Sequence, residues 1–307
     1  MNTISKNVHK KAILAVIIGN VIFGFSFLFS KIALQYVVPS MLIATRFMVA
    51  FLVLNVIAFV GSRIKRTDGK PWIEFSLKGK PLKDVLLLAL FQPILYFAAE
   101  NYGILYTSSA FAGIIISVIP LAGIVADVLI MHAKVERKQI ICASCSVVGV
   151  ALTTLGAKDM NSSVKGLFIL LVAVAVGALF YVYSQKSGEY YNALERTYVM
   201  FGAGSIVYVI VAAIQCRGAY DKMILEPLGK PALWVSIAYL AVISSVVAFL
   251  LLNFGSTHVS VSQASLFANL TTVISIVAGV VILHESFTTS QIVGAVVILS
   301  SVYFANR

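Results

Sequence analysis

Charged residues are scarce in this chain, and their scarcity excludes a water-soluble fold. Only 11% of the 307 residues are Asp, Glu, Lys or Arg, whereas 60% are hydrophobic. The mean hydropathy is +0.98. A soluble globule needs more polar surface than this composition provides. We therefore expect the chain to lie in a membrane.

Cysteine is nearly absent, and the familiar catalytic patterns are missing. Of the three cysteines, Cys142 and Cys145 form a Cys-x-x-Cys pair inside an apolar run, with no second pair and no nearby His, so no metal site is expected. No His-Glu-x-x-His, Gly-x-Ser-x-Gly or nucleotide-binding loop occurs in the sequence. These absences argue against an enzyme and against a bound cofactor.

What the chain has instead is a series of long apolar runs. Each run approaches the roughly 20 residues that a helix needs to cross a bilayer. Their continuity favours helices over the alternating strands of a membrane barrel. The sequence predicts an all-α integral membrane protein with ten transmembrane helices, at residues 12–34, 42–61, 84–102, 109–131, 139–157, 166–185, 194–214, 232–252, 262–283 and 290–305.

The positive charges predict how these helices are oriented. Lys and Arg together number 23, and with an intracellular N-terminus sixteen of them fall in cytoplasmic segments and five in outer loops. This is the positive-inside distribution, so both chain ends are expected in the cytoplasm. The charge then needs no nucleic-acid partner to explain it. The basic cytoplasmic loop 62–83 is expected to contact membrane lipid.

Part of the sequence occurs twice. Residues 96–150 align without gaps on residues 248–302, at a constant shift of 152 positions, and 15 of the 54 pairs from position 97 to 150 are identical. Repeats of this length identify an architecture. Because each half has five helices, an odd number, the second half enters the membrane upside down. We therefore predict two inverted five-helix repeats, residues 1–157 and 158–307; a weaker match pairs Gly24 with Gly177.

The two copies differ at ionisable positions, which indicates where function resides. Glu100 aligns with Leu252, so this carboxylate occurs in the first half only. Tyr96 lies one helical turn earlier, in position to donate a hydrogen bond to it. Burial away from water favours the neutral form of a carboxyl group, so Glu100 is a candidate for proton exchange or for pairing with a cationic substrate. The alternative is a static ion pair with Arg46 or Lys31.

Other polar residues and a proline complete the predicted site. Asn101, Asn253, Tyr181, Tyr183 and Tyr239 are expected to line a central cavity with Tyr96, Arg46 and Lys31, although each is also of a type common in interhelical and interfacial contacts. Pro120 can kink its helix, and its counterpart is Thr272. Asp127, opposite Gly279, and Glu285, opposite Ala133, are the other candidates for a hinge or gate. The alternatives are solvation or a pair with Lys134 for Asp127, and a cap contact for Glu285.

These features resemble the EamA-type branch of the drug/metabolite transporter superfamily. The resemblance rests on Gly24 to Lys31, Pro39 with Arg46, Glu100-Asn101-Tyr102-Gly103, Pro120, and His284-Glu285 followed by Gln291 and Gly294. Thr272 and Ala133 depart from the proline and glutamate that are common in the family. The likeness implies a carrier of the bacterial inner (plasma) membrane.

Such a carrier is commonly an exporter of a small metabolite, such as an amino acid, an amine or a related amphipathic compound. It works by alternating access, with or without proton exchange. A membrane-embedded enzyme and a non-transporting structural or receptor protein are the alternatives from other classes. The expected partners are the small-molecule substrate and membrane lipid, with no nucleic acid, and the protein is expected to be a monomer or a homodimer.

Overall fold

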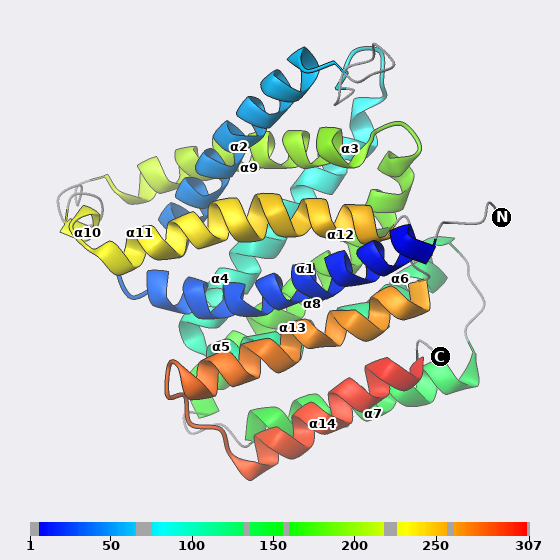
Figure 1. Ribbon diagram of the computed structural model, residues 1–307. Coiled ribbons are helices and arrows are strands. Elements are labelled where there is room, and N and C mark those ends of the chain that lie inside the picture. The colour runs from blue at the N-terminus through cyan, green and yellow to red at the C-terminus, as the bar shows by residue number, and fades with distance from the viewer. Residues whose placement is uncertain are drawn as a thin grey trace.

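The computed structural model describes residues 6–65, 75–131, 136–155, 160–217, 226–256 and 261–305. All elements of this described part are helical (Figure 1). In chain order they are α1 (Lys6–Ala33), α2 (Pro39–Arg63), α3 (Leu82–Ala89), a π-helical segment (Leu90–Leu95), α4 (Tyr96–Tyr106), α5 (Ser109–Ile116), α6 (Ile119–Met131), α7 (Arg137–Leu155), α8 (Met160–Gly188), α9 (Ala193–Gln215), α10 (Glu226–Leu228), α11 (Pro231–Ala238), a second π-helical segment (Tyr239–Ala248), α12 (Phe249–Ser256), α13 (Val261–Val281) and α14 (Thr289–Ala305).

Many of these helices are long and apolar enough to cross a membrane. Seven stretches of the described residues qualify, namely Val8–Ala33, Pro39–Arg63, Leu82–Tyr106, Ser109–Ala126, Arg137–Leu155, Ala193–Gln215 and Pro231–Leu252. Three shorter apolar helices cover Val164–Phe180, Asn269–Val281 and Thr289–Ala305. Each apolar run in the sequence thus falls on a helix, and the chain is a multi-pass membrane protein.

The outside of the helix bundle is apolar as well as its interior. On α2, Leu52 and Phe59 expose 59% and 63% of their surface, and on α7 Val147 exposes 68%. In water such side chains would favour burial by roughly 25 cal/mol per Å². Exposing the same side chains to lipid tails has no such free-energy cost, so these faces indicate contact with the hydrocarbon core of a bilayer.

The helix over Leu82–Tyr106 is interrupted near its middle. Gln92 has the non-helical angles φ −143° and ψ 120°, and Pro93 follows it. Proline has no N–H to donate and its ring crowds the preceding turn, so the regular hydrogen-bond ladder breaks here. The helix over Pro231–Leu252 carries the second π-helical segment. The repeat shift places residues 90–95 on 242–247, so both irregular segments lie at equivalent positions. The apolar runs alone predict neither.

The helix over residues 109–131 is also divided. α5 ends at Ile116, and α6 begins at Ile119, with a turn at Ser117 and Val118 between them. Pro120 stands in the first turn of α6, where a missing N–H costs least. The proline therefore separates two short helices, in agreement with the kink expected from the sequence.

Glycines allow two equivalent pairs of helices to pack closely. α1 packs on α13, and α8 packs on α6. A Cβ atom on Gly24 of α1 would lie 2.8 Å from the carbonyl oxygen of Thr271, and one on Gly177 of α8 would lie 2.8 Å from the Cδ1 atom of Ile119. Thr271 and Ile119 are themselves paired by the repeat shift. The contacts of Gly24 in one half are thus matched by those of Gly177 in the other.

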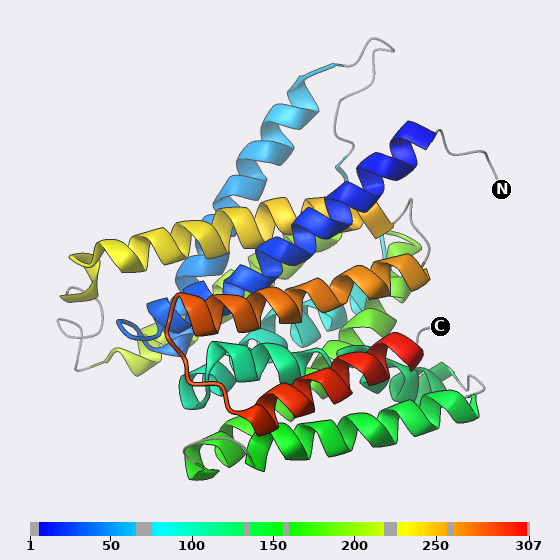
Figure 2. The same ribbon diagram turned by 60° about the horizontal axis from the view of Figure 1, so that its bottom comes forward.

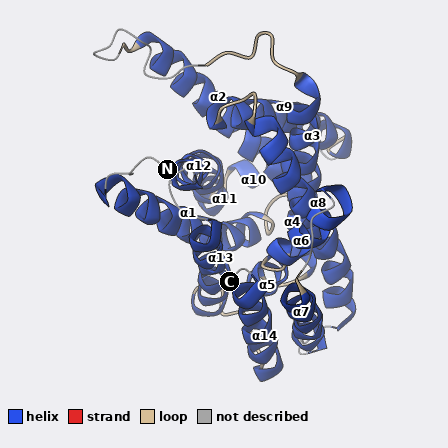
Figure 3. Ribbon diagram, turned by 90° about the vertical axis from the view of Figure 1, so that its right-hand side faces the viewer, coloured by secondary structure: helices blue, strands red, loops and turns tan. Residues whose placement is uncertain are grey.

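The last helices of the two halves, α7 and α14, pack along each other at one edge of the bundle (Figure 3). Gly149 and Gly294 face one another there, and a Cβ atom on Gly149 would lie 2.9 Å from the carbonyl oxygen of Gly294. Small residues of this kind permit backbones to approach closely within a membrane.

The two ends of the bundle differ in what they carry. The start of α1 and the end of α14 lie at the same end of the bundle (Figures 1 and 2), and we call this the terminal end. The opposite end carries the connections α1–α2, α4–α5 and α13–α14, and we call it the corner end.

Candidate functional site

Arg46 lies in the interior of the bundle, where an unpaired charge would be very costly. It projects from α2 and exposes only 2% of its surface. Its Nε atom donates to the hydroxyl of Ser245 at 2.9 Å, and its Nη2 atom donates to the hydroxyl of Ser244 at 3.2 Å. Both serines belong to the second π-helical segment. A side chain of the first half is therefore anchored on the irregular helix of the second half.

The flat face of the Arg46 guanidinium is covered by aromatic rings. Its central carbon lies 4.4 Å from the ring centroid of Phe97 and 5.6 Å from that of Phe47. Cation–π contacts at such distances stabilise a desolvated arginine. The sequence left a static ion pair with Glu100 as an alternative for Arg46, whereas hydroxyls and rings surround this arginine in the structure.

Glu100 lies on α4 and exposes 6% of its surface. The Tyr96 hydroxyl donates to its Oε1 atom at a long 3.4 Å, as the one-turn spacing leads one to expect. Glu100 and Arg46 attract each other electrostatically, but no nitrogen–oxygen contact within 4.0 Å joins them. In the part of the chain that the structure describes, the ion pair that meets this limit joins Lys80 and Glu195. Glu100 is thus a buried acid without an ion-pair partner.

Hydroxyl groups extend the cluster from α2 to α1. The Ser244 and Ser26 hydroxyls are hydrogen-bonded at 2.7 Å. Tyr239 donates to the carbonyl oxygen of Ile22 at 2.9 Å, and its ring stacks on Phe29 with centroids 4.1 Å apart. α1, α2, α4 and the second π-helical segment therefore meet at one polar cluster, which draws on both halves of the sequence.

Asn101 is adjacent to Glu100 and is almost completely buried, with 1% of its surface exposed. Its Nδ2 atom donates to the carbonyl oxygen of Phe97 at 2.8 Å, while its Oδ1 atom is buried without a hydrogen-bond partner. A buried acceptor left unpaired is unusual and costs stability. Glu100 thus has a long hydrogen bond and no ion pair, and Asn101 beside it on α4 has an unused acceptor.

Three other predicted residues lie away from this cluster. Lys31 donates to the carbonyl oxygens of Ile104 and Thr107 at the corner end. The Tyr183 ring packs against Phe91, with centroids 5.2 Å apart. The side chains of Tyr181, Asn253 and Asp127 lie outside the described residues. Glu285 is at the corner end, where it bonds to the start of α5.

Several residues of the site escaped the sequence prediction. Ser26 and Ser245 carry no distinctive local pattern, because their partners are about 200 positions away. Tyr208 of α9 donates to the carbonyl oxygen of Ile94 in the first π-helical segment. Pro93, a proline in mid-helix, was the available signal that the helix is interrupted beside Ile94, although the carbonyl group that a proline frees lies four residues before it.

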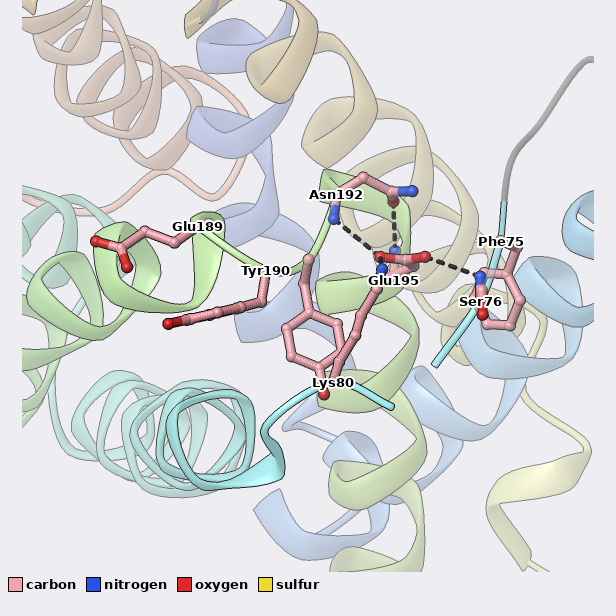
Figure 4. A pocket seen from close by; sticks show the side chains of 9 residues that line it. Phe75, Ser76, Lys80, Glu189, Tyr190, Asn192 and Glu195 are labelled. Atoms are coloured by element: carbon pink, nitrogen blue, oxygen red, sulfur yellow. Dashed lines mark hydrogen bonds and ion pairs between the residues drawn. The ribbon is translucent and has the colours of Figure 1, made fainter. Parts of the chain in front are cut away.

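A separate cavity of about 410 Å³ lies between the segment before α3 and the α8–α9 turn. Figure 4 shows the side chains around it, with Glu195 at the centre of a group of donors. The Glu195 carboxylate accepts from the backbone N–H groups of Ser76 and Asn192 at 2.8 and 3.0 Å and from Lys80. Asn192 in turn caps α9 by accepting from the Glu195 N–H at 2.9 Å. This acid is fully bonded, in contrast to Glu100.

Comparisons with known proteins agree on the kind of protein. A family model described as "EamA-like transporter family" matches the chain twice, over residues 10–155 and 164–307. The chain is 30% identical to "Uncharacterized transporter YcxC" of Bacillus subtilis (strain 168), over 98% of its own length and 94% of that protein. It is 24% identical to an "Uncharacterized transporter" of Archaeoglobus fulgidus, over 92% and 94%. One solved crystal structure shares the fold, with a TM-score of 0.64, 16% identity and 97% coverage of both chains.

Proposed function

The chain belongs to the EamA-like transporter family and is a membrane transporter, and we propose that it exports a small metabolite by alternating access, in exchange for protons. The observation that carries this proposal is the buried carboxylate of Glu100, which has no ion-pair partner and lies in a polar cluster built by both halves of the chain. An acid in such a place can bind a proton or a cationic group of a substrate, and it can exchange one for the other.

The proposed architecture is ten membrane-crossing helices in two inverted halves, 1–157 and 158–307. Three observations support it. The family model matches twice, with one match in each half. Gly24 and Gly177 pack against residues that are themselves equivalent in the repeat. The two π-helical segments lie at corresponding positions. Transporters of this design hold their substrate between the halves, which is where Arg46 meets Ser244 and Ser245.

The proposed location is the plasma membrane, with both chain ends in the cytoplasm. The support is the excess of Lys and Arg in the segments assigned to the cytoplasm. The start of α1 and the end of α14 also lie at the same end of the bundle. The terminal end then faces the cytoplasm and the corner end faces outward.

At the proposed substrate site each group has its own part. Glu100 binds the proton or the cationic group, and Tyr96 orients its carboxylate. Arg46, held by two serines and two rings, supplies a fixed positive charge. Asn101 offers an unused acceptor, and Tyr239 presents an aromatic wall. An amphipathic solute with an amino group fits this combination.

The test begins with cells that express the wild-type chain, the Glu100→Gln variant or neither, and compares the small metabolites in their media. We expect at least one amino-group-containing metabolite to accumulate with wild type only. That compound is then used in proteoliposomes, where its flux must follow an imposed pH gradient without conversion to a product. The exposed Glu136 provides the matched control, Glu136→Gln, which must behave as wild type.

Three outcomes would count against the proposal. Accumulation without any flux in proteoliposomes would contradict transport. Product formation would favour a membrane-embedded enzyme. Flux that ignores the pH gradient would leave a carrier that only facilitates diffusion.

A further inference from the structure

The carboxylate of Glu285, in the α13–α14 connection, holds the start of α5. Its Oε1 atom accepts from the Ser109 N–H at 2.7 Å, and its Oε2 atom accepts from the Ser109 hydroxyl at 3.0 Å and the Ala110 N–H at 3.1 Å. The first N–H groups of a helix have no partner within the helix, and the helix dipole favours a negative charge beside them. A carboxylate from the second half of the chain thus caps the N-terminus of a helix of the first half.

The backbone around Glu285 is shaped to deliver this carboxylate. His284 has φ 53°, a left-handed conformation that costs a non-glycine residue about 1 kcal/mol. The N–H of Glu285 donates to the carbonyl oxygen of Gly279 at 3.0 Å. A Cβ atom on Gly279 would lie 2.3 Å from the Oε2 atom of Glu285. Because Gly279 has no side chain, the carboxylate of Glu285 can occupy the space beside it.

Lys31 holds the other side of the same corner. Its ammonium group donates to the carbonyl oxygens of Ile104, at 2.8 Å, and Thr107, at the end of α4. The last carbonyl groups of a helix are also unpaired, and their dipole favours a cation. Lys31 and Glu285 attract each other electrostatically as well. The α4–α5 corner is thus held by a cation from α1 and an anion from the α13–α14 connection, each of the sign that the helix end prefers.

The sequence repeat carries this arrangement once only. The shift of 152 positions places Glu285 on Ala133, and it places Gly279, against which the carboxylate packs, on Asp127. Ala133 has no carboxylate, so the first half lacks the residue that would hold the second half in the equivalent way. If two otherwise symmetric halves have one such contact, the contact stabilises one of their two alternating states more than the other.

We infer that Glu285 and Lys31 form a clasp that biases the transport cycle toward the state closed at the corner end. The inference rests on alternating access, as proposed above. In this proposal the contacts between Glu285 and α5, which join the two halves, exist only while the corner is closed. They therefore stabilise that state, and their loss shifts the population toward the state open at this end.

The test uses the full chain in lipid nanodiscs and needs no substrate. Amide hydrogen exchange over residues 106–112 reports the Ser109 and Ala110 N–H groups directly. Glu285→Gln is expected to accelerate exchange there by about tenfold or more. Gly279→Ala must act in the same direction, because it displaces the carboxylate without removing its charge. The matched control is Glu195→Gln, which is expected to change exchange near Ser76 and Asn192 and to leave residues 106–112 unchanged.

A second measurement separates a clasp from a simple helix cap. A cysteine replaces Ile104, which is fully buried behind the corner, in a background with Cys142, Cys145 and Cys216 changed to serine. Glu285→Gln is expected to raise the rate of labelling by a water-soluble maleimide about tenfold, whereas Glu195→Gln leaves it unchanged. Faster exchange without faster labelling would reduce Glu285 to a cap and overturn the inference. Unchanged exchange, or an equal increase in every helix, would also overturn it. Absent metabolite flux would count against the proposed transport instead.

Discussion

The guanidinium of Arg46 lies over the ring of Phe97, 4.4 Å from its centroid, while Glu100, one helical turn further along the same helix as Phe97, makes no ion pair with it. The positive charge is held by a ring and two hydroxyls, and the acid is left to its long hydrogen bond with Tyr96. The two opposite charges therefore attract each other across the site without cancelling in a direct contact.

Replacing Arg46 by lysine tests whether the shape of the guanidinium matters. Lysine keeps the charge, but its ammonium group has no planar face and does not hold its donors in the fixed arrangement that Nε and Nη2 of Arg46 present to Ser245 and Ser244. We expect Arg46→Lys to lower the free energy of unfolding by about 2 kcal/mol, measured by thermal melting in detergent. Arg63, exposed at the end of α2 with its charge over Phe59, supplies the control: Arg63→Lys should melt like wild type. Equal melting of the two variants would mean that charge alone is needed at position 46.

The serines that hold Arg46 can be removed one at a time. Ser245→Ala leaves the Nε donor of Arg46 without its partner, and Ser244→Ala also removes the hydrogen bond to Ser26. Each loss should cost about 1–3 kcal/mol, with Ser244→Ala at least as costly. Ser205, whose hydroxyl bonds only within its own helix, is the control, and Ser205→Ala should have little effect. A similar result for all three would argue that the serines do not support Arg46.

Glu100→Gln keeps the size of the side chain and an acceptor for Tyr96, but it cannot exchange a proton. We expect the variant to insert and fold normally, as judged by gel filtration and melting. Flux of the identified metabolite driven by a pH gradient in proteoliposomes should fall by about tenfold or more. Normal gradient-driven flux through this variant would place the coupling proton on another group.

Glycine substitutions should follow the space around each position. A Cβ atom on Gly24 meets the carbonyl oxygen of Thr271 at 2.8 Å, which is backbone and cannot move aside, whereas one on Gly177 meets the flexible end of Ile119. Gly123 has nothing within 4 Å. Gly24→Ala should therefore lower the free energy of unfolding by about 1–3 kcal/mol and give the largest fall in melting temperature. Gly177→Ala should lower the melting temperature less, and Gly123→Ala should not lower it. The reverse order would contradict the close packing of α1 on α13.

The sequence predicted the helices better than their interruptions. The length and apolarity of the runs were enough to locate helices such as α2 and α9, because a span must satisfy its own backbone groups in lipid. The kink near Pro120 was also foreseen. Pro93 passed unnoticed inside an apolar run, and nothing in the residues of Tyr239–Ala248 marks a wider helical turn.

The candidate site was predicted only in part, and the reason differs from the one that applies to the helices. Glu100 and Arg46 stood out because charge in an apolar helix is rare, and Tyr96 followed from helical spacing. An ion pair with Glu100 was an alternative for Arg46 because a carboxylate is its strongest Coulombic partner, whereas the fold brings hydroxyls and rings to this arginine. Apart from Phe47, which is the next residue along α2, those neighbours come from distant parts of the chain, and no local sequence pattern predicts them.

Because of the widened turn at Tyr239–Ala248, a change of one residue in the length of this helix alters which side chains face Arg46. Successive residues of a helix are offset by about 100° around its axis. Deleting one residue of this segment ahead of Ser244 would rotate the residues after the deletion by that amount relative to those before it. Ser244 and Ser245 would then swing away from Arg46, and their lipid-facing neighbours would take their place against the guanidinium.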